Sequence, residues 1–111
     1  ALNACIETNE AIVAKDKNIV VGALAFIRDD AEIAFLAVHP DYRNQGIAKT
    51  LIKRMISLFH SGTRISVVTY CEGDEKGSFA RRLYEGIGFC GGEFLSAFDY
   101  PCQEMYYIVS K

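Results

Sequence analysis

The 111-residue sequence lacks the features that would place it in a membrane or on a secretion route. No apolar run approaches the roughly 18–20 residues that a membrane-spanning helix needs. Residues 1–10 contain no basic segment and no continuous apolar stretch, so they do not predict a signal peptide. We therefore expect a cytoplasmic protein with no membrane partner. An initiator methionine is also missing, which fits either a processed chain or a fragment of a longer one.

An excess of positive charge is missing too. Lys and Arg number 12 against 14 Asp and Glu, which gives a formal net charge of −2. Binding to nucleic acid usually needs a basic surface, so we expect no nucleic-acid partner. Half of the residues are hydrophobic and 23% are charged, as in folded globular chains. The length predicts a single small domain over residues 1–111.

Spacings typical of metal sites are absent from the sequence. The four cysteines are Cys5, Cys71, Cys90 and Cys102. They form no C-x-x-C pair or zinc-finger pattern, and the two histidines, His39 and His60, lie far apart. We therefore expect no metal, and four reduced thiols in the absence of a secretion signal. A bridge between Cys90 and Cys102 stays open, because the two could become neighbours in a sheet.

Apolar patterning predicts the element order βββαβαββ. The predicted strands are residues 11–14, 19–27, 32–38, 64–70, 94–100 and 105–109, with Pro101 separating the last two. Apolar residues at four-residue spacing predict one amphipathic helix after Gly46, and a second one carrying Phe79, Leu83 and Ile87. Gly86 and Gly88 are expected to end the second helix. We predict an α/β (α+β) fold: a mixed, mostly antiparallel sheet of about six strands with two main helices.

The segment from Pro40 to Ala48 connects a buried strand to the first helix and is the first candidate site. A helix N-terminus presents unpaired N–H groups and partial positive charge, so it can hold an anion. Gly46 permits close backbone approach, and Arg43 adds a guanidinium suited to phosphate. The alternative is an ordinary strand–helix connection with a permissive glycine. The segment is not a P-loop, which ends in Gly-Lys-Ser/Thr.

Two further side chains could take part in chemistry. Tyr84 lies beside the apolar face of the second helix, from which its phenol could reach a cleft; the alternative is a ring in the core with its hydroxyl at the edge. Glu32 begins a strand, and a carboxylate beside apolar strands could have a raised pKa and act as a general base. The alternative for Glu32 is a solvated carboxylate at a strand end.

The order of these segments is more specific than any one of them. A strand, Val-His-Pro-x-Tyr-Arg-x-x-Gly-x-Ala, a helix, a strand and then Ala-Arg-x-Leu-Tyr-x-x-x-Gly-Phe resemble the GNAT superfamily of acetyl-CoA-dependent N-acetyltransferases. The resemblance extends from about Ile19 to Val109. It implies an acyl-CoA N-acyltransferase-like fold and acetyl-CoA as the cosubstrate.

The resemblance also implies roles for particular residues. The pyrophosphate of acetyl-CoA would be held by Arg43, Asn44, Gln45, Gly46, Ile47 and Ala48. The pantetheine arm would meet main-chain groups of Leu36, Ala37 and Val38, on a strand that commonly carries a β-bulge. Tyr84 would be the general acid. Glu32 matches the general base of the histone-acetyltransferase branch, in a similar Glu-Ile-x-Phe-x-Ala-Val run.

These roles imply direct transfer of an acetyl group to a primary amine of a small molecule or a peptide. Glu32 would accept a proton from the amine, an amide near Ala37 or Val38 would stabilise the oxyanion, and Tyr84 would protonate the leaving thiolate. No cysteine is needed as a nucleophile. The acidic balance is compatible with a cationic amine as the acceptor.

The sequence departs from the family pattern before its first predicted strand. Members normally carry a further strand and one or two helices there, and only about ten residues precede that strand here. Three interpretations follow: a fragment, a minimal enzyme with an open acceptor groove, or a homodimer that completes the groove. The competing function is a non-catalytic acyl-CoA-binding module.

Overall fold

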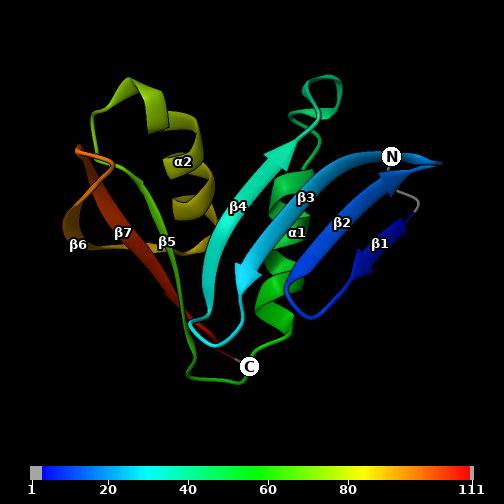
Figure 1. The fold of residues 1–111 in the computed structure, drawn as a ribbon, viewed down its shortest axis with the longest axis horizontal. Helices are drawn as coiled ribbons and strands as arrows, with labels where there is room; N and C mark the ends of the chain where they lie inside the picture. Colours follow the sequence, from blue (N-terminus) through cyan, green and yellow to red (C-terminus); the bar gives the residue numbers. More distant parts are fainter. Residues whose placement is uncertain (1–3, 111) are drawn as a thin grey trace. The chain divides into compact units, whose positions relative to one another are not determined.

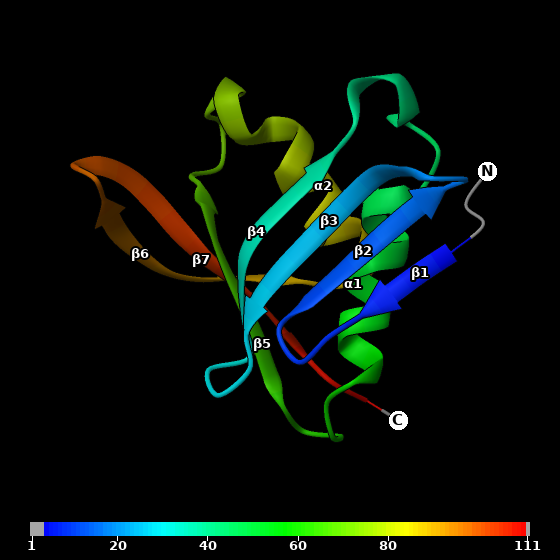
Figure 2. The same ribbon diagram turned by 45° about the vertical axis from the view of Figure 1, so that its right-hand side comes forward.

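The computed structural model describes residues 4–110, and the chain forms two compact units, Ala1–His60 and Ser61–Lys111. The first unit contains β1 (Ala4–Glu7), β2 (Ala11–Asp16), β3 (Ile19–Ile27), β4 (Glu32–Val38) and α1 (Ile47–Ser57). Its strands pair antiparallel in the order β1-β2-β3-β4, and α1 packs across β2, β3 and β4 (Figures 1 and 2). The structure thus adds β1 to the predicted order.

The core of the first unit lies between α1 and these strands. The inward face of α1 buries Ile47, Leu51, Ile52 and Met55, the residues whose spacing predicts the helix. The strands contribute Ile12, Leu24 and Phe26 to the same core. Burying each such side chain stabilises the fold by roughly 1.5–3 kcal/mol.

Gly22 lets the start of α1 approach β3 closely. A Cβ atom built at Gly22 would lie 2.8 Å from Cγ2 of Ile47 and 3.2 Å from Cδ1 of Leu51. Ile47 is the first residue of α1, so this contact sets the position of the helix N-terminus relative to the strands. A strand glycine usually weakens a sheet, and here it serves the close packing of a helix.

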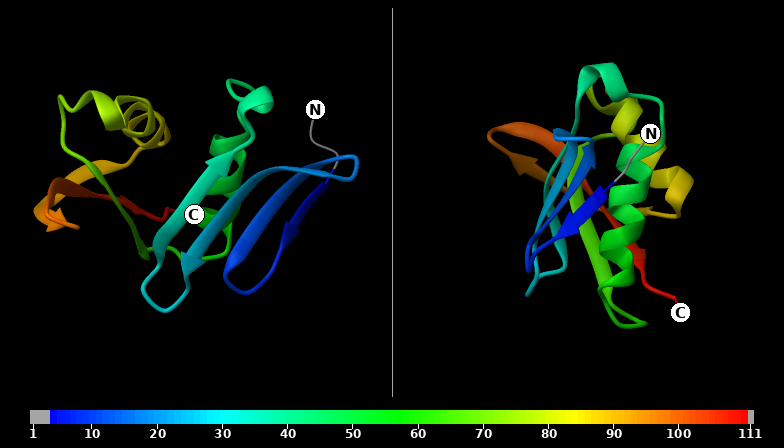
Figure 3. Two further views of the ribbon diagram at one scale, coloured as in Figure 1. Left: turned by 45° about the horizontal axis from the view of Figure 1, so that its top comes forward. Right: turned by 90° about the vertical axis from the view of Figure 1, so that its right-hand side faces the viewer.

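The second unit contains β5 (Arg64–Tyr70), α2 (Ser78–Ile87), β6 (Cys90–Ala97) and β7 (Tyr100–Ile108). The strands pair antiparallel in the order β5-β7-β6, and α2 contacts β5 (Figure 3). The prediction that Pro101 separates the last two strands is wrong. The turn is Phe98-Asp99, both with positive φ, and Pro101 lies near the start of β7, where a strand tolerates a missing N–H.

The buried face of α2 also differs from the prediction. Phe79 is 59% exposed, whereas Arg81 and Tyr84 are buried at 8% and 5% exposure. Phe79, Leu83 and Ile87 therefore do not mark the inward face of α2, because the buried Arg81 occupies part of that face. Gly86 lies inside the helix, and Gly88, with φ of 123°, is the residue that caps it.

The described cysteines Cys71, Cys90 and Cys102 are free thiols. Cys90 lies opposite Tyr106, and Cys102 lies opposite Leu95. Because these pairs are several positions apart along β6 and β7, the bridge between Cys90 and Cys102 that the sequence left open does not form.

The contact at Gly22 predicts a specific stability change. Gly22→Ala should lower the free energy of unfolding by about 1–3 kcal/mol, because the new methyl group overpacks the interface with α1. Gly86→Ala is the matched control: it has ordinary helical φ and open space around it, so it should stabilise by about 0.5–1 kcal/mol. Urea unfolding of both variants measures the difference. Equal effects at the two positions would contradict the proposed role of Gly22.

Candidate functional site

A β-bulge interrupts the pairing of β4 with β3. Ala25 pairs with Phe35, but the next residue, Phe26, pairs with Ile33, so β4 carries one extra residue, Ala34. Ala34 and Phe35 are both exposed, as expected where a bulge turns consecutive side chains outward. The bulge that the family resemblance implies is therefore present, before Leu36.

Beyond the bulge, the pairing of β4 determines which way its amides point. The His39 amide donates to the carbonyl of Val21 at 2.8 Å. Such bonded positions recur at every second residue of an antiparallel pair, so the Ala37 amide also faces β3. The Leu36 and Val38 amides point away from β3. The sequence predicts an oxyanion contact from the Ala37 or the Val38 amide. Of these two, only the Val38 amide points away from β3.

The loop after β4 forms an anion-binding geometry at the start of α1. Gly46 caps the helix with φ of 79°, and Asn44 also has positive φ, at 64°. Gly46 supplies no side-chain cap, and the first turn of α1 contains no acidic residue. A left-handed residue followed by a helical one directs successive N–H groups into one concavity. Together with the helix dipole, this favours an anion.

The side chains of the loop are accessible, and its beginning is braced. Arg43, Asn44 and Gln45 are exposed. Nδ1 of His39 accepts the Asp41 amide at 3.1 Å, and the Tyr42 hydroxyl donates to Asp16 at 3.1 Å. This hydrogen bond raises the pKa of Tyr42. The loop is therefore anchored to the end of β2 while its anion-binding end faces solvent.

Glu32 lies at the opposite end of β4 from this loop. It is half-buried and pairs with Ile27, and no hydrogen bond or ion pair to the residues that the structure describes involves its side chain. Six strand steps of about 3.3 Å separate Glu32 from Val38, a distance of about 20 Å. A molecule that reaches both the loop and Glu32 must be elongated along β4.

Tyr84 is the site residue of the second unit. Its ring packs on Phe89 with the centroids 5.4 Å apart, and Phe89 in turn contacts Tyr107. Burial raises the pKa of the Tyr84 phenol above its ordinary value of 10.0. A raised pKa keeps the phenol protonated at neutral pH, as a proton donor requires.

A buried arginine holds the helix that carries Tyr84. Arg81 donates from Nη1 to the Tyr70 carbonyl at 3.2 Å and to Oε1 of Gln103 at 2.8 Å. Gln103 donates onward to the Gly92 carbonyl at 3.0 Å. The chain of bonds ties α2 to β5, β7 and β6. Nε of Arg81 is buried without a hydrogen-bond partner among the described atoms.

The structure brings together only part of the predicted site. Leu36, Ala37 and Val38 lead through a short 3₁₀ turn, Pro40–Tyr42, into the loop from Arg43 to Ala48. Tyr84 belongs to the other compact unit. Sequence reasoning missed Gly22 and Arg81. A glycine inside a β-branched run was the available signal for Gly22. The Ala-Arg-x-Leu-Tyr motif, which specifies position 81 and leaves position 82 open, was the available signal for Arg81.

Two further classes of site are absent from residues 4–110. No group of three or more His, Cys, Asp or Glu side chains there could hold a metal ion. No helix in that part of the chain is long and apolar enough to cross a membrane.

A protein-family model described as an acetyltransferase (GNAT) domain matches residues 7–90, more than half of the chain. The chain therefore belongs to the GNAT acetyltransferase family, which is a family of acyltransferases. No curated protein sequence matches it.

Solved structures share the fold. A GNAT-family protein from Desulfovibrio desulfuricans has a TM-score of 0.75 and 19% identity over 90% of this chain and 68% of its own. The ribosomal-protein-S18-alanine N-acetyltransferase of Escherichia coli has a TM-score of 0.71 and 17% identity, over 95% of this chain and 73% of its own. The NatC complex bound to Gag peptide and CoA contains a chain with a TM-score of 0.72 and 25% identity, over 90% of this chain and 71% of its own. These likenesses confirm the predicted α+β, acyl-CoA N-acyltransferase-like fold.

Burial of Tyr84 predicts a pH dependence of stability. Below pH 10 the phenol is neutral in both the folded and the unfolded state, and above it the unfolded phenol ionises first. Stability should therefore fall as pH rises from the unfolded pKa through the raised folded one, by up to about 1.4 kcal/mol per pH unit. Denaturant unfolding from pH 8 to 11.5 should show a steeper loss for the wild type than for Tyr84→Phe. Parallel curves would contradict this assignment.

Proposed function

We propose that this chain binds acetyl-CoA and transfers its acetyl group directly to a primary amine of a small molecule or peptide. The observation that carries the proposal is the loop from Arg43 to Ala48. It joins an uncapped helix N-terminus, a left-handed glycine and an exposed guanidinium immediately after a bulged strand. This combination suits a pyrophosphate, and an ordinary strand–helix connection does not require it.

The residues of this chain fit an elongated cosubstrate. Arg43 and the amides from Gly46 to Ala48 would hold the pyrophosphate, and main-chain groups of Leu36, Ala37 and Val38 would meet the pantetheine arm. The run of β4 from the loop to Glu32, about 20 Å, matches an extended molecule. When bound, acetyl-CoA supplies an activated thioester carbonyl.

Each remaining step belongs to a group of the chain. Glu32, directly or through water, would accept the proton that an amine with a pKa near 10 must lose before it attacks. A main-chain amide of β4 that points away from β3 would stabilise the developing oxyanion, and of the two such amides Leu36 lies nearer to Glu32 than Val38 does. Tyr84, kept protonated by burial, would donate a proton to the leaving thiolate.

The loop assignment predicts an effect on cosubstrate binding. Arg43→Gln should raise the KM for acetyl-CoA roughly tenfold or more with little change in kcat, because a charged hydrogen bond contributes about 1.5–3 kcal/mol. Lys53→Gln is the control, an exposed cation farther along α1, and should change KM less than about twofold. Steady-state kinetics over a panel of primary amines measures both. Equal effects of the two substitutions would reject the loop as the pyrophosphate site.

The catalytic assignments predict different pH profiles. Tyr84→Phe should lower kcat by about a hundredfold at every pH below 10, the lower end of the usual range because a thiolate leaves readily. Glu32→Gln should lower kcat most at neutral pH and approach the wild type near the pKa of the amine. Full activity of Tyr84→Phe would reject the general-acid role. Binding of CoA without transfer to any amine would instead favour the acyl-CoA-binding module.

A further inference from the structure

Two side chains that the proposed reaction leaves without a role meet beside the anion-binding loop. Tyr42 ends the 3₁₀ turn Pro40–Tyr42 and directly precedes Arg43, the guanidinium proposed to hold the pyrophosphate. The Tyr42 hydroxyl donates to a carboxylate oxygen of Asp16, the last residue of β2, at 3.1 Å. Both side chains are half-buried, whereas Arg43 and the two residues after it are exposed. The hydrogen bond therefore lies at the boundary between the packed strands and the exposed loop.

Tyr42 is also held from a second strand. Its ring meets the ring of His39 with the centroids 5.5 Å apart and the planes at 89°. The Tyr42 amide donates to the His39 carbonyl at 2.9 Å, and the His39 amide donates to the Val21 carbonyl of β3 at 2.8 Å. β3 thus holds the turn through His39, and β2 holds it through Asp16. Because the ring and the hydroxyl are both held, the main chain leaves Tyr42 from a defined position.

The loop is anchored at its two ends and has few contacts between them. Its far end is Ile47, which packs against Gly22 of β3. Between the two ends, the side chains of residues 43–45 make no hydrogen bond to the part of the chain that the structure describes. Asn44 and Gly46 have positive φ, a conformation that persists only where the surrounding structure holds it. The arrangement of the loop amides therefore depends on the anchors at Tyr42 and Ile47.

The carboxylate of Asp16 has two opposite effects on an anion-binding loop. An aspartate is an ordinary residue before a turn, but this one accepts a hydrogen bond from a residue 26 positions later, which a turn does not need. A carboxylate near a pyrophosphate repels it, so the charge alone favours a neutral residue here. A charged acceptor also makes the stronger hydrogen bond, which is what the carboxylate adds at this position. Substitution can separate the charge from the hydrogen bond.

From these contacts we propose that Asp16 and Tyr42 are positioning residues for acetyl-CoA. Their hydrogen bond holds Arg43 and the loop amides in the anion-binding arrangement before the cosubstrate binds. The inference rests on the proposed function and deepens it. A loop that is ordered in advance loses less conformational freedom on binding, which raises affinity without any new contact to the ligand. Loss of the hydrogen bond should therefore weaken cosubstrate binding and leave the chemical step unchanged.

Calorimetric titration of CoA into the wild type and Tyr42→Phe tests the proposal. Tyr42→Phe removes the hydroxyl and keeps the ring that contacts His39. CoA affinity should fall about five- to tenfold, the scale of one hydrogen bond. In turnover, the KM for acetyl-CoA should rise by the same factor while kcat stays nearly constant, because the lost interaction does not involve the reacting atoms. An unchanged CoA affinity, or a loss confined to kcat, would overturn the proposal.

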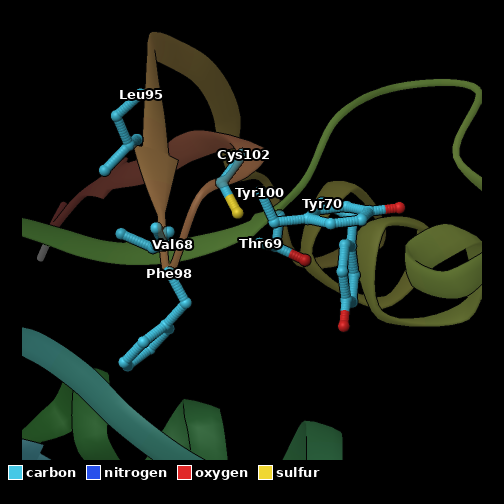
Figure 4. Close-up of a pocket in the computed structure, with 8 residues that line it drawn as sticks. Val68, Thr69, Tyr70, Leu95, Phe98, Tyr100 and Cys102 are labelled. Carbon is cyan, nitrogen blue, oxygen red and sulfur yellow. The ribbon is translucent and has the colours of Figure 1, made fainter.

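The second unit offers a matched control in Tyr100. Its hydroxyl donates to Asp74, also 26 positions away, at 2.7 Å, and its ring meets that of Tyr70 at 88° with the centroids 5.4 Å apart. Figure 4 shows both tyrosines at the hollow beside the β6–β7 hairpin, which is also lined by Val68, Leu95, Phe98 and Cys102. Tyr100→Phe should lower the melting temperature about as much as Tyr42→Phe and leave CoA affinity unchanged. Equal losses of CoA affinity would trace the effect to general stability and overturn the proposal.

A pair of substitutions at Asp16 separates the hydrogen bond from the charge. Asp16→Asn keeps an acceptor oxygen for Tyr42 and removes the negative charge, so CoA affinity should stay close to that of the wild type. Asp16→Ala removes both, and CoA affinity should fall as it does in Tyr42→Phe. The double variant Asp16→Ala/Tyr42→Phe should bind CoA no more weakly than the weaker single variant, because both substitutions break the same bond. Tighter binding by Asp16→Ala than by the wild type, or equal weakening by Asn and Ala, would overturn the proposal.

A measurement without ligand distinguishes this proposal from the proposed function. Order parameters from amide relaxation in NMR report the fast mobility of each backbone N–H group. Those of residues 43–48 should be lower in Tyr42→Phe than in the wild type, and those in Tyr100→Phe should match the wild type. Unchanged order parameters in Tyr42→Phe would overturn the proposal whether or not CoA binds. If the wild type bound no CoA, the proposed function would be rejected, while a loss of order in Tyr42→Phe would still show that Asp16 holds the loop.

Discussion

The close approach of α1 to β3 at Gly22 is the contact on which the geometry of the first unit depends. Ile47 begins the helix and also fills the space that a side chain at position 22 would occupy. This packing fixes the position of the first turn of α1 and so the direction of the N–H groups that follow Gly46. The helix dipole also acts within about that first turn. A larger residue at position 22 would move the charged end of the helix relative to β4. Core packing and anion binding are therefore parts of one constraint.

The second unit uses a different means to hold its functional helix. α2 buries a guanidinium and a phenol where an amphipathic helix usually buries aliphatic side chains. Arg81 is tolerated there because Gln103 and the Tyr70 carbonyl accept from it, which offsets much of the cost of burial. Its Nε lacks a partner, so the arrangement retains part of that cost. In return, one side chain ties the helix of Tyr84 to both β5 and β7.

Much of this architecture could be predicted from the sequence, and the failures have identifiable causes. The strands 19–27, 32–38 and 64–70 have the predicted bounds, because runs of apolar and β-branched residues end at turn residues. The hairpin at Phe98 was not predicted, since Phe98 is not a usual positive-φ residue and Pro101 gave a stronger local signal. The inward face of α2 was not predicted, because only a partner distant in sequence, Gln103, makes a buried Arg81 favourable. The loop after β4 was predictable because its chemistry is local.

The same distinction bears on the acceptor. Net charge is a property of the whole chain and suggested a cationic amine, whereas selectivity depends on the groups that surround the ligand. In the second unit the side chains that line the hollow beside the β6–β7 hairpin are apolar or hydroxyl-bearing, and Glu104 is paired with Arg64. The Phe98–Asp99 turn closes the β6–β7 hairpin with two positive-φ residues, the geometry that a two-residue type I′ turn requires. Net charge therefore carries little weight in assigning an acceptor, because it does not describe the groups that a ligand would contact.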